Sequence, residues 1–239
     1  MKHLSKPIIG LVSGIGPLAG ADIFTKLLAY AATAYGAKED ADYPDCIVIN
    51  HGITGVDKTA APSSHFKDEL STIVEQLYSA GASIIGIACN TAHIYYEELP
   101  QKPGAHLVHL IDEVSKRAQK ISASKLVLSS TTTRNKGLYI QYLRRHGVAF
   151  ASLTEELQPT LDAAIDAVMA YRLHDAGRAI EIVLAYAASE GFEHIIAGCT
   201  ELPIALRYAQ QANQFTIIDA NQILAETLVD RYYEELKLF

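Results

Sequence analysis

The chain has 239 residues, of which 49% are hydrophobic and 20% are charged, and its formal net charge is −7. This composition fits a globular protein with a sizeable core and excludes a disordered chain. The acidic balance gives no basis for binding nucleic acid or an anionic membrane surface, and the sequence lacks the long apolar run of a membrane span. The N-terminus has no signal-peptide pattern, so we expect a cytoplasmic protein.

The three cysteines, Cys46, Cys89 and Cys199, are too few and too odd in number for a disulfide framework. We expect free thiols and no metal site, because no Cys-x-x-Cys or His-x-x-x-His pair accompanies them. Cys46 lies inside a plain apolar run and is expected to be inert packing.

Apolar runs that predict buried strands alternate with helical patterns along the chain. The first run, 7–12, leads through a glycine turn at 13–17 into a helix that begins at Pro17. The second strand, 46–50, ends in a polar loop that reaches residue 61, a place where parallel sheets often bind ligands. In order, the later predicted elements are a helix over 64–80, a strand over 84–88, a helix ending near Pro100, a strand over 107–111, a helix over 112–120, a strand over 125–129, a hydroxyl-rich turn at 130–133, a helix over 139–146, a short strand at 149–151, a helical stretch over 160–188 interrupted near His174, a strand over 195–198, a strand over 215–219 and a helix over 222–237.

Strands that alternate with helices predict parallel sheets joined by right-handed crossovers. The break at 100–104 divides the elements into two sets, and we expect the last strand and helix to return to the first set. The predicted fold class is therefore α/β, with two similar lobes related by pseudo-twofold symmetry and a cleft between them. One lobe comprises residues 1–103 plus 214–239, and the other comprises residues 104–213.

Cys89 and Cys199 occupy matching places in the two predicted lobes. Each ends an apolar run and precedes a small polar residue and a helical segment. A helix N-terminus carries partial positive charge and free N–H groups, which favour a thiolate, and Asn90, Thr91 and Thr200 can cap these helices or hold a carboxylate. Two thiols that face each other across a cleft can take a proton from one face of a carbon and deliver one to the other.

The chain resembles the aspartate/glutamate racemase family on three motifs, which are the glycine turn within 10–19, Cys89-Asn90-Thr91-Ala92-His93, and Gly198-Cys199-Thr200-Glu201. The resemblance implies two Rossmann-like lobes, often assembled as a homodimer, that racemise an acidic amino acid, aspartate or glutamate, without pyridoxal phosphate or another cofactor. It also implies that Cys89 and Cys199 are the catalytic residues. The pair Thr200-Glu201 is similar to the aspartate racemase form of the second motif.

We expect a small-molecule amino acid to be held by residues of these motifs and of the predicted strand ends. The expected substrate-binding residues are Ser13, Gly14, Asn50, Lys58, Asn90, Thr91, Thr131, Thr133, Thr200 and Glu201. Lys58 stands where aspartate racemases commonly carry an arginine, so the charge is kept and the bidentate geometry is lost. Ser13 replaces a usual glycine.

Other interpretations stay open. The same pair of thiols is compatible with hydantoin racemisation or maleate isomerisation, whereas a decarboxylation usually needs only one such cysteine. A binding or regulatory protein that lost turnover is a further alternative. The turn also matches a loose dinucleotide-binding pattern at Gly14, Gly16 and Ala19, but no acidic residue closes the second strand as that pattern requires. His93 is expected either to pack and cap its helix or to take part in catalysis.

Overall fold

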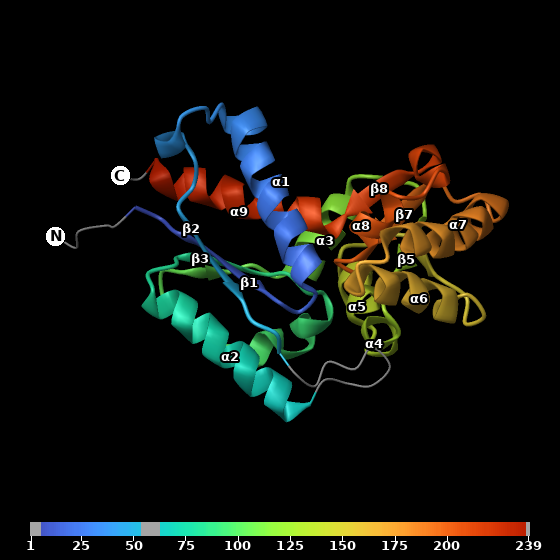
Figure 1. The fold of residues 1–239 in the computed structure, drawn as a ribbon, viewed down its shortest axis with the longest axis horizontal. Helices are drawn as coiled ribbons and strands as arrows, with labels where there is room; N and C mark the ends of the chain where they lie inside the picture. The colour runs from blue at the N-terminus through green and yellow to red at the C-terminus, as the bar shows by residue number, and fades with distance from the viewer. Residues whose placement is uncertain (1–5, 54–62, 238–239) are drawn as a thin grey trace.

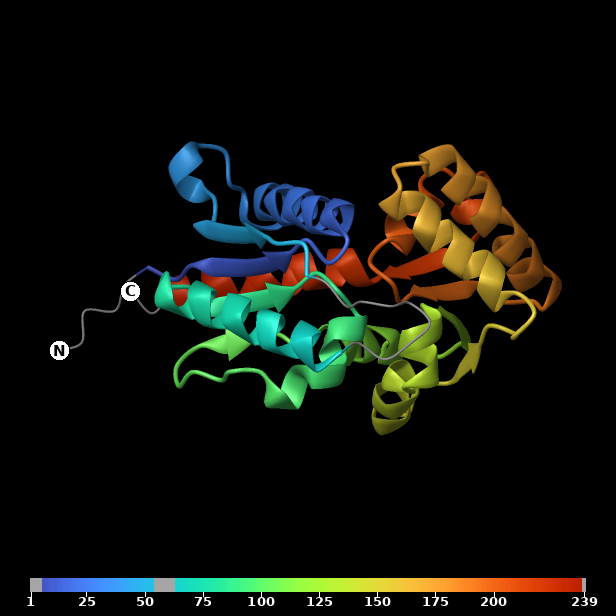
Figure 2. The ribbon, with the colours of Figure 1, turned by 60° about the horizontal axis from the view of Figure 1, so that its bottom comes forward.

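The computed structural model describes residues 6–53 and 63–237 (Figure 1). Lys58, an expected substrate-binding residue, lies outside the described residues. The described chain forms two lobes, each built on a four-stranded parallel sheet, and Figure 2 shows the two lobes side by side. No helix among the described residues is both long enough and apolar enough to cross a membrane.

The first sheet has the strand order β2-β1-β3-β4. Its strands are β1 (Ile9–Ser13), β2 (Cys46–Asn50), β3 (Ile84–Ile87) and β4 (His106–Leu107), and all of their pairings are parallel. β1 and β3 are buried along their whole length. Continuous apolar runs of this kind suit central parallel strands, because helices cover both faces of the sheet.

Helices pack on both faces of the first sheet. One face carries α1 (Pro17–Tyr35) and α9 (Ala220–Leu236), and the other carries α2 (Ser64–Ser79), as Figure 1 shows. α3 (Leu110–Gln119) packs against α9 and against elements of the second lobe. Short 3-10 helices lie at η1 (Asp40–Asp42) and η2 (Thr91–Glu98). α9 approaches β3 closely at Gly86, where a Cβ atom would lie 2.9 Å from Cδ1 of Leu228.

The second sheet repeats this order as β6-β5-β7-β8. Its strands are β5 (Lys125–Leu128), β6 (Phe150–Ser152), β7 (His194–Ala197) and β8 (Thr216–Asp219), again all parallel. The helices of this half are α4 (Thr131–Asn135), α5 (Leu138–Arg145), α6 (Gln158–Met169), α7 (Leu173–Ser189), α8 (Leu202–Leu206) and η3 (Gln211–Gln214). Since β3 and β7 hold equivalent places in the two sheets, the residues that follow them hold equivalent places too.

The predicted α/β fold with two parallel-sheet lobes is confirmed, but two strands belong to a different sheet from the one expected. β8 pairs with β7 and does not return to the first set, although α9 does return and packs along α1. β4 follows the break at 100–104 yet pairs with β3. The sheet that a short strand joins depends on the strand with which it pairs, and the composition of a few residues does not specify that partner. The proposed division at 103/104 stays a prediction.

Two local details also differ from the sequence pattern. The segment after Cys89 is a 3-10 helix and not an α-helix. The break between α6 and α7 lies at 170–172 and not at His174, and Tyr171 in this break has a left-handed φ of 58°. A non-glycine residue in this conformation ends a helix sharply.

Candidate active site

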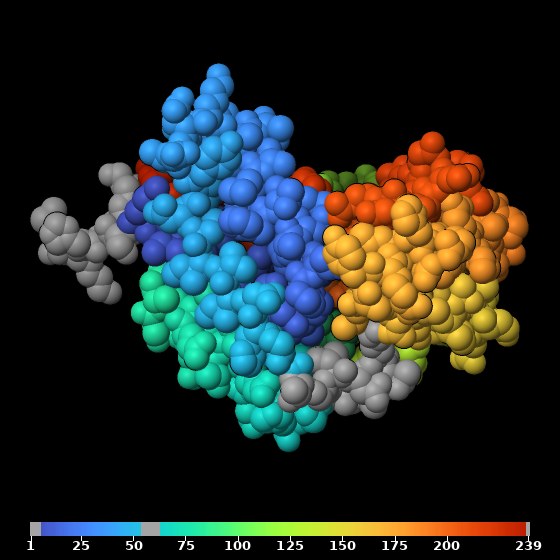
Figure 3. Space-filling view, viewed as in Figure 1, coloured from blue at the N-terminus to red at the C-terminus, as the bar shows by residue number. Residues whose placement is uncertain are grey.

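Cys89 and Cys199 line the same cavity, which has a volume of about 150 Å³ and lies between the two lobes. Figure 3 shows the surfaces of the two lobes meeting, blue for the α1 region and yellow to red for the second lobe. The lining residues are Gly14, Ile15, Gly16, Ile53, Cys89, Asn90, Thr91, Ser130, Ile165, Met169, Cys199, Thr200 and Glu201. Both cysteine motifs therefore contribute to one site, as the sequence predicts.

Cys89 follows β3 and is 7% exposed. Burial and the carboxylate of Glu201 raise the pKa of its thiol to about 12, while the N–H groups of Thr91 and Ala92 act in the opposite direction. The expectation of a thiolate favoured by a helix N-terminus is therefore wrong in its net direction for this structure. The N–H groups are in place, but the cost of burying a negative charge exceeds their effect.

Cys199 follows β7 and is 9% exposed. Its Sγ lies 3.0 Å from Oε2 of Glu201 and donates a hydrogen bond to that carboxylate. Burial and this carboxylate raise the pKa of the Cys199 thiol well above its ordinary value, and the charge of Cys89 adds to the effect. Burial and Glu201 are thus common causes of the raised pKa of both thiols.

The first motif is held by hydroxyl groups from the second lobe. Oδ1 of Asn90 accepts a hydrogen bond from the hydroxyl of Tyr139 at 2.7 Å, and Oγ1 of Thr91 lies 2.8 Å from Oγ1 of Thr133. Oγ of Ser130 lies 3.4 Å from the same Thr91 atom. Asn90 is 2% exposed, and its Nδ2 has no hydrogen-bond partner in the described structure. A buried donor without a partner is costly, so this amide is available to an acceptor in the cavity.

The imidazole of His93 has a structural place. Its Nδ1 lies 2.9 Å from the carbonyl oxygen of Cys89, and its Nε2 accepts a hydrogen bond from the N–H of Leu110 at 3.1 Å. Nδ1 faces a carbonyl oxygen and must donate, while Nε2 faces an N–H group and must accept. The ring is therefore the neutral tautomer with its proton on Nδ1. Burial lowers the pKa of His93 to about 4. The ring therefore ties Cys89 to α3 and serves as a packing residue, the first of the two expected alternatives.

The glycine turn brings backbone close to other parts of the site. Gly14 and Gly16 have φ values of 96° and 83°. A Cβ atom on Gly14 would lie 2.2 Å from the carbonyl oxygen of His51, and one on Gly16 would lie 2.0 Å from Oε1 of Glu201. These contacts explain both glycines within the protein itself, without a nucleotide.

Several expected substrate-binding residues lie beside the cavity and do not line it. Oγ of Ser13 donates to Oδ1 of Asn50 at 3.0 Å. Thr131 donates to the carboxylate of Asp162 through its backbone N–H, at 3.2 Å, and through its hydroxyl. Thr133 contacts Thr91, as described above. The substrate-binding roles of these residues stay predictions.

The cavity also contains residues that the sequence patterns did not single out. Ser130 belongs to the predicted hydroxyl-rich turn, so its position in that turn is the signal that could have found it. The apolar part of the wall comes from Ile15, Ile53, Ile165 and Met169, which look like ordinary core residues in sequence. Within the described residues, no group of three or more His, Cys, Asp or Glu side chains is arranged to hold a metal ion.

The fold and the site define a two-lobed α/β protein with one cysteine from each lobe in a shared cavity. Residues 12–228 match the model of the family described as Asp/Glu/Hydantoin racemase, and the chain belongs to this family. The family confirms the prediction of an isomerase, an amino-acid racemase.

Individual relatives cover nearly the whole chain. The broad specificity amino-acid racemase RacX of Bacillus subtilis is 25% identical over 225 residues, which are 94% of this chain and 98% of that protein. The aspartate racemase structure from Picrophilus torridus has a TM-score of 0.83 and 24% identity, covering 97% of this chain and 98% of its own. The glutamate racemase RacE1 of Bacillus anthracis has a TM-score of 0.67 and 17% identity, covering 98% and 84%. These structural likenesses show a shared fold.

Proposed function

We propose that the protein interconverts the L- and D-forms of an amino acid by proton transfer between Cys89 and Cys199, without a cofactor. The observation that carries the proposal is that both thiols line one cavity, each following the third strand of its own sheet. Inversion at a carbon needs a base on one face and an acid on the other, and two cysteines from opposite lobes meet that need.

The proton balance closes over one turnover. One cysteine, as thiolate, takes the α-proton, so that a Cα–H bond breaks, an S–H bond forms and the electron pair stays on the substrate. The opposite S–H bond then breaks as its proton reaches the other face of Cα. After one turnover the first cysteine is a thiol and the second is a thiolate. This is the protonation state that the reaction of the opposite enantiomer requires. Charge that develops on the substrate carboxylate would meet the Nδ2 donor of Asn90 and the hydroxyl of Ser130.

The proposed substrates begin with the acidic amino acids, aspartate and glutamate, in accord with the cysteine motifs. The described part of the wall includes the apolar side chains of Ile15, Ile53, Ile165 and Met169. Apolar side chains favour an uncharged substrate side chain, and the relative from Bacillus subtilis is named for broad specificity. Neutral amino acids are therefore the second candidate substrates.

The proposal is tested by α-proton exchange in D₂O, followed by NMR. The reduced protein is incubated with both enantiomers of aspartate, glutamate and a panel of neutral amino acids, with hydantoins and maleate as the alternative substrates. We expect exchange of both enantiomers of at least one amino acid, and a loss of about 100- to 10,000-fold in Cys89→Ser and in Cys199→Ser. Cys46→Ser is the matched control, since Cys46 lies on β2 outside the cavity. Full activity in both active-site variants would refute the two-thiol mechanism.

We also propose a cytoplasmic homodimer. The three cysteines are free, which supports a reducing compartment. Light scattering coupled to size-exclusion chromatography would measure the mass in solution, and a mass near 26.0 kDa, that of one chain, would contradict the dimer.

A further inference from the structure

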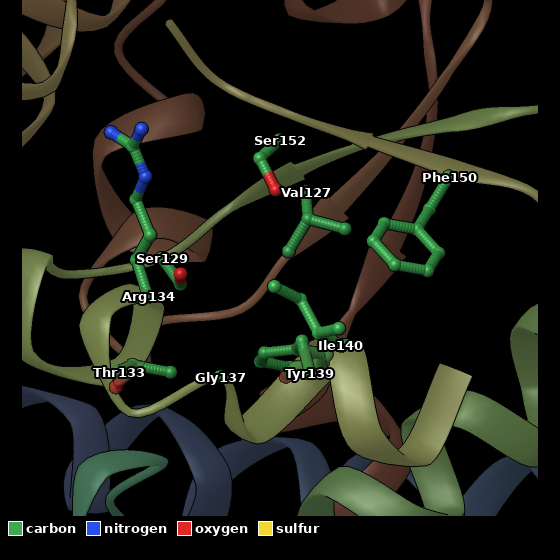
Figure 4. Close-up of a pocket in the computed structure, with 9 residues that line it drawn as sticks. All are labelled: Val127, Ser129, Thr133, Arg134, Gly137, Tyr139, Ile140, Phe150 and Ser152. Carbon is green, nitrogen blue, oxygen red and sulfur yellow. The ribbon is translucent and has the colours of Figure 1, made fainter. Parts of the chain in front are cut away.

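Tyr139 on α5 contacts both cysteine motifs. Its hydroxyl donates to Oδ1 of Asn90, the residue after Cys89, at 2.7 Å. Its ring packs on Gly198, the residue before Cys199, where a Cβ atom would lie 2.6 Å from Cε2 of the ring. Figure 4 shows Tyr139 beside Ile140 among the residues that line a second, small pocket. One side chain of the second lobe thus touches the segments that carry both thiols.

The phenol is suited to a fixed hydrogen bond. Tyr139 is 3% exposed, and burial raises the pKa of its hydroxyl far above the ordinary value. It therefore stays protonated and acts as a donor. A donor toward Asn90 can be accepted only by Oδ1, so the amide has one orientation. In this orientation the NH₂ group is left without a partner in the described structure, on a residue that lines the cavity.

We infer that Tyr139 is a positioning residue that fixes the amide of Asn90, so that its NH₂ group is presented to a carboxylate oxygen of the substrate. The inference rests on the proposed function. Without the phenol, the amide can turn over and present its oxygen to the carboxylate, and the two like partial charges then repel each other. Tyr139 acts through Asn90 and does not itself reach the reacting atoms.

The variant Tyr139→Phe tests this inference, because it keeps the ring on Gly198 and removes only the hydroxyl. In the α-proton exchange assay we expect KM to rise about tenfold, while kcat changes less than about threefold, since binding of the carboxylate is the affected step. Tyr142→Phe is the matched control. Tyr142 lies on the same helix, is 8% exposed and packs on His109, and its variant should keep the wild-type KM.

A double-mutant cycle with Asn90→Ala separates positioning from a general structural effect. If Tyr139 acts through Asn90, Tyr139→Phe has no further effect in the Asn90→Ala background. If turnover of Asn90→Ala is too slow to measure, the increase in Tm on adding substrate measures binding in the wild type, the two single variants and the double variant. Additive effects, or a wild-type KM in Tyr139→Phe, would overturn the inference while the racemase stands. A wild-type protein that exchanges no α-proton would overturn the proposed function, and this inference with it.

Discussion

Sγ of Cys199 lies 3.0 Å from Oε2 of Glu201, two residues further along the chain. The same carboxylate raises the pKa of both active-site thiols. It therefore keeps them in the protonated form that an acid requires, and it opposes the thiolate form that a base requires. A substitution of Glu201 should therefore change the pKa of both Cys89 and Cys199.

The variant Glu201→Gln should lower the pKa of both thiols, because it removes the negative charge and keeps the size of the side chain. Each unit of decrease raises the thiolate fraction about tenfold below the pKa. We expect faster alkylation of Cys89 and Cys199 by iodoacetamide at pH 8, measured by peptide mass spectrometry, and a pH profile of kcat/KM displaced to lower pH. Glu190→Gln, on the exposed end of α7, is the control. Alkylation rates that stay at the wild-type value would contradict the role given to Glu201.

The sequence was sufficient for the parts of the site that follow directly from strand ends. Cys89 and Cys199 could be predicted to meet because both end central strands of parallel sheets. Ser130 and Thr131 show where such prediction ends. Both belong to one hydroxyl-rich turn, but Ser130 is the N-cap of α4 and lines the cavity, while Thr131 turns to Asp162. Ser130 lies before the helix with an extended backbone, and Thr131 is the first helical residue, so the point at which the helix begins decides which of the two faces the cavity.

Long-range partners were beyond the sequence for a different reason. Tyr139 is 49 positions from Asn90, and no local motif marks it. The pairing of β8 with β7 likewise depends on which edge of a sheet is free, and the four residues of β8 do not carry that information. The pKa of the thiols depends on burial, which outweighs the local effect of the helix N-terminus.

Replacement of His93 should change how stability depends on pH. The folded-state pKa of His93 is lowered to about 4, whereas an unfolded histidine titrates near ~6.5. Between these values the unfolded chain binds the extra proton, so the free energy of unfolding falls as the pH falls, by about 1.4 kcal/mol per pH unit for one group. Above this window the group contributes no pH dependence, and below it the loss is complete.

Urea unfolding of His93→Gln between about pH 4 and 6.5 should therefore show a slope reduced by about one proton. His109, whose pKa is lowered to about 3, still contributes to the slope in both proteins. His65→Gln is a control that removes an exposed histidine on α2. An unchanged slope in His93→Gln would show that this imidazole is not the buried neutral group described above.

Loss of the Asp22 carboxylate should weaken the contact between α1 and the second lobe. Asp22, with a side chain 5% exposed, accepts hydrogen bonds from Lys26 at 2.8 Å, from Asn221 at 2.7 Å and from Arg207. Nδ2 of Asn221 also donates to the carbonyl oxygen of Thr200 at 2.8 Å, so the network reaches the second cysteine motif.

We expect Asp22→Asn to lower the free energy of unfolding by about 2 kcal/mol, since charge-assisted bonds are lost in a buried setting. Asp175→Asn removes a carboxylate that is 41% exposed and pairs with Arg178, and such a surface pair contributes about 0–1 kcal/mol. Urea denaturation of the two variants measures the difference. An equal decrease in the free energy of unfolding in both variants would show that the buried Asp22 network stabilises the protein no more than a surface ion pair does.

Replacement of Gly16 by alanine should lower activity, because the new side chain would meet Glu201. Both Gly16, with φ of 83°, and Gly36, with φ of 75°, are left-handed, so an alanine at either position costs about 1–2 kcal/mol of backbone strain. A Cβ atom at Gly16 would lie 2.0 Å from Oε1 of Glu201, whereas nothing lies within 4 Å of one at Gly36. We therefore expect Gly16→Ala to lose at least as much stability in urea as Gly36→Ala, because both share the strain and only Gly16→Ala also displaces a buried carboxylate. Only Gly16→Ala displaces the carboxylate that holds Cys199, so only its α-proton exchange should fall, by at least about tenfold. Comparable exchange rates in the two variants would mean that the position of Glu201 does not matter for turnover.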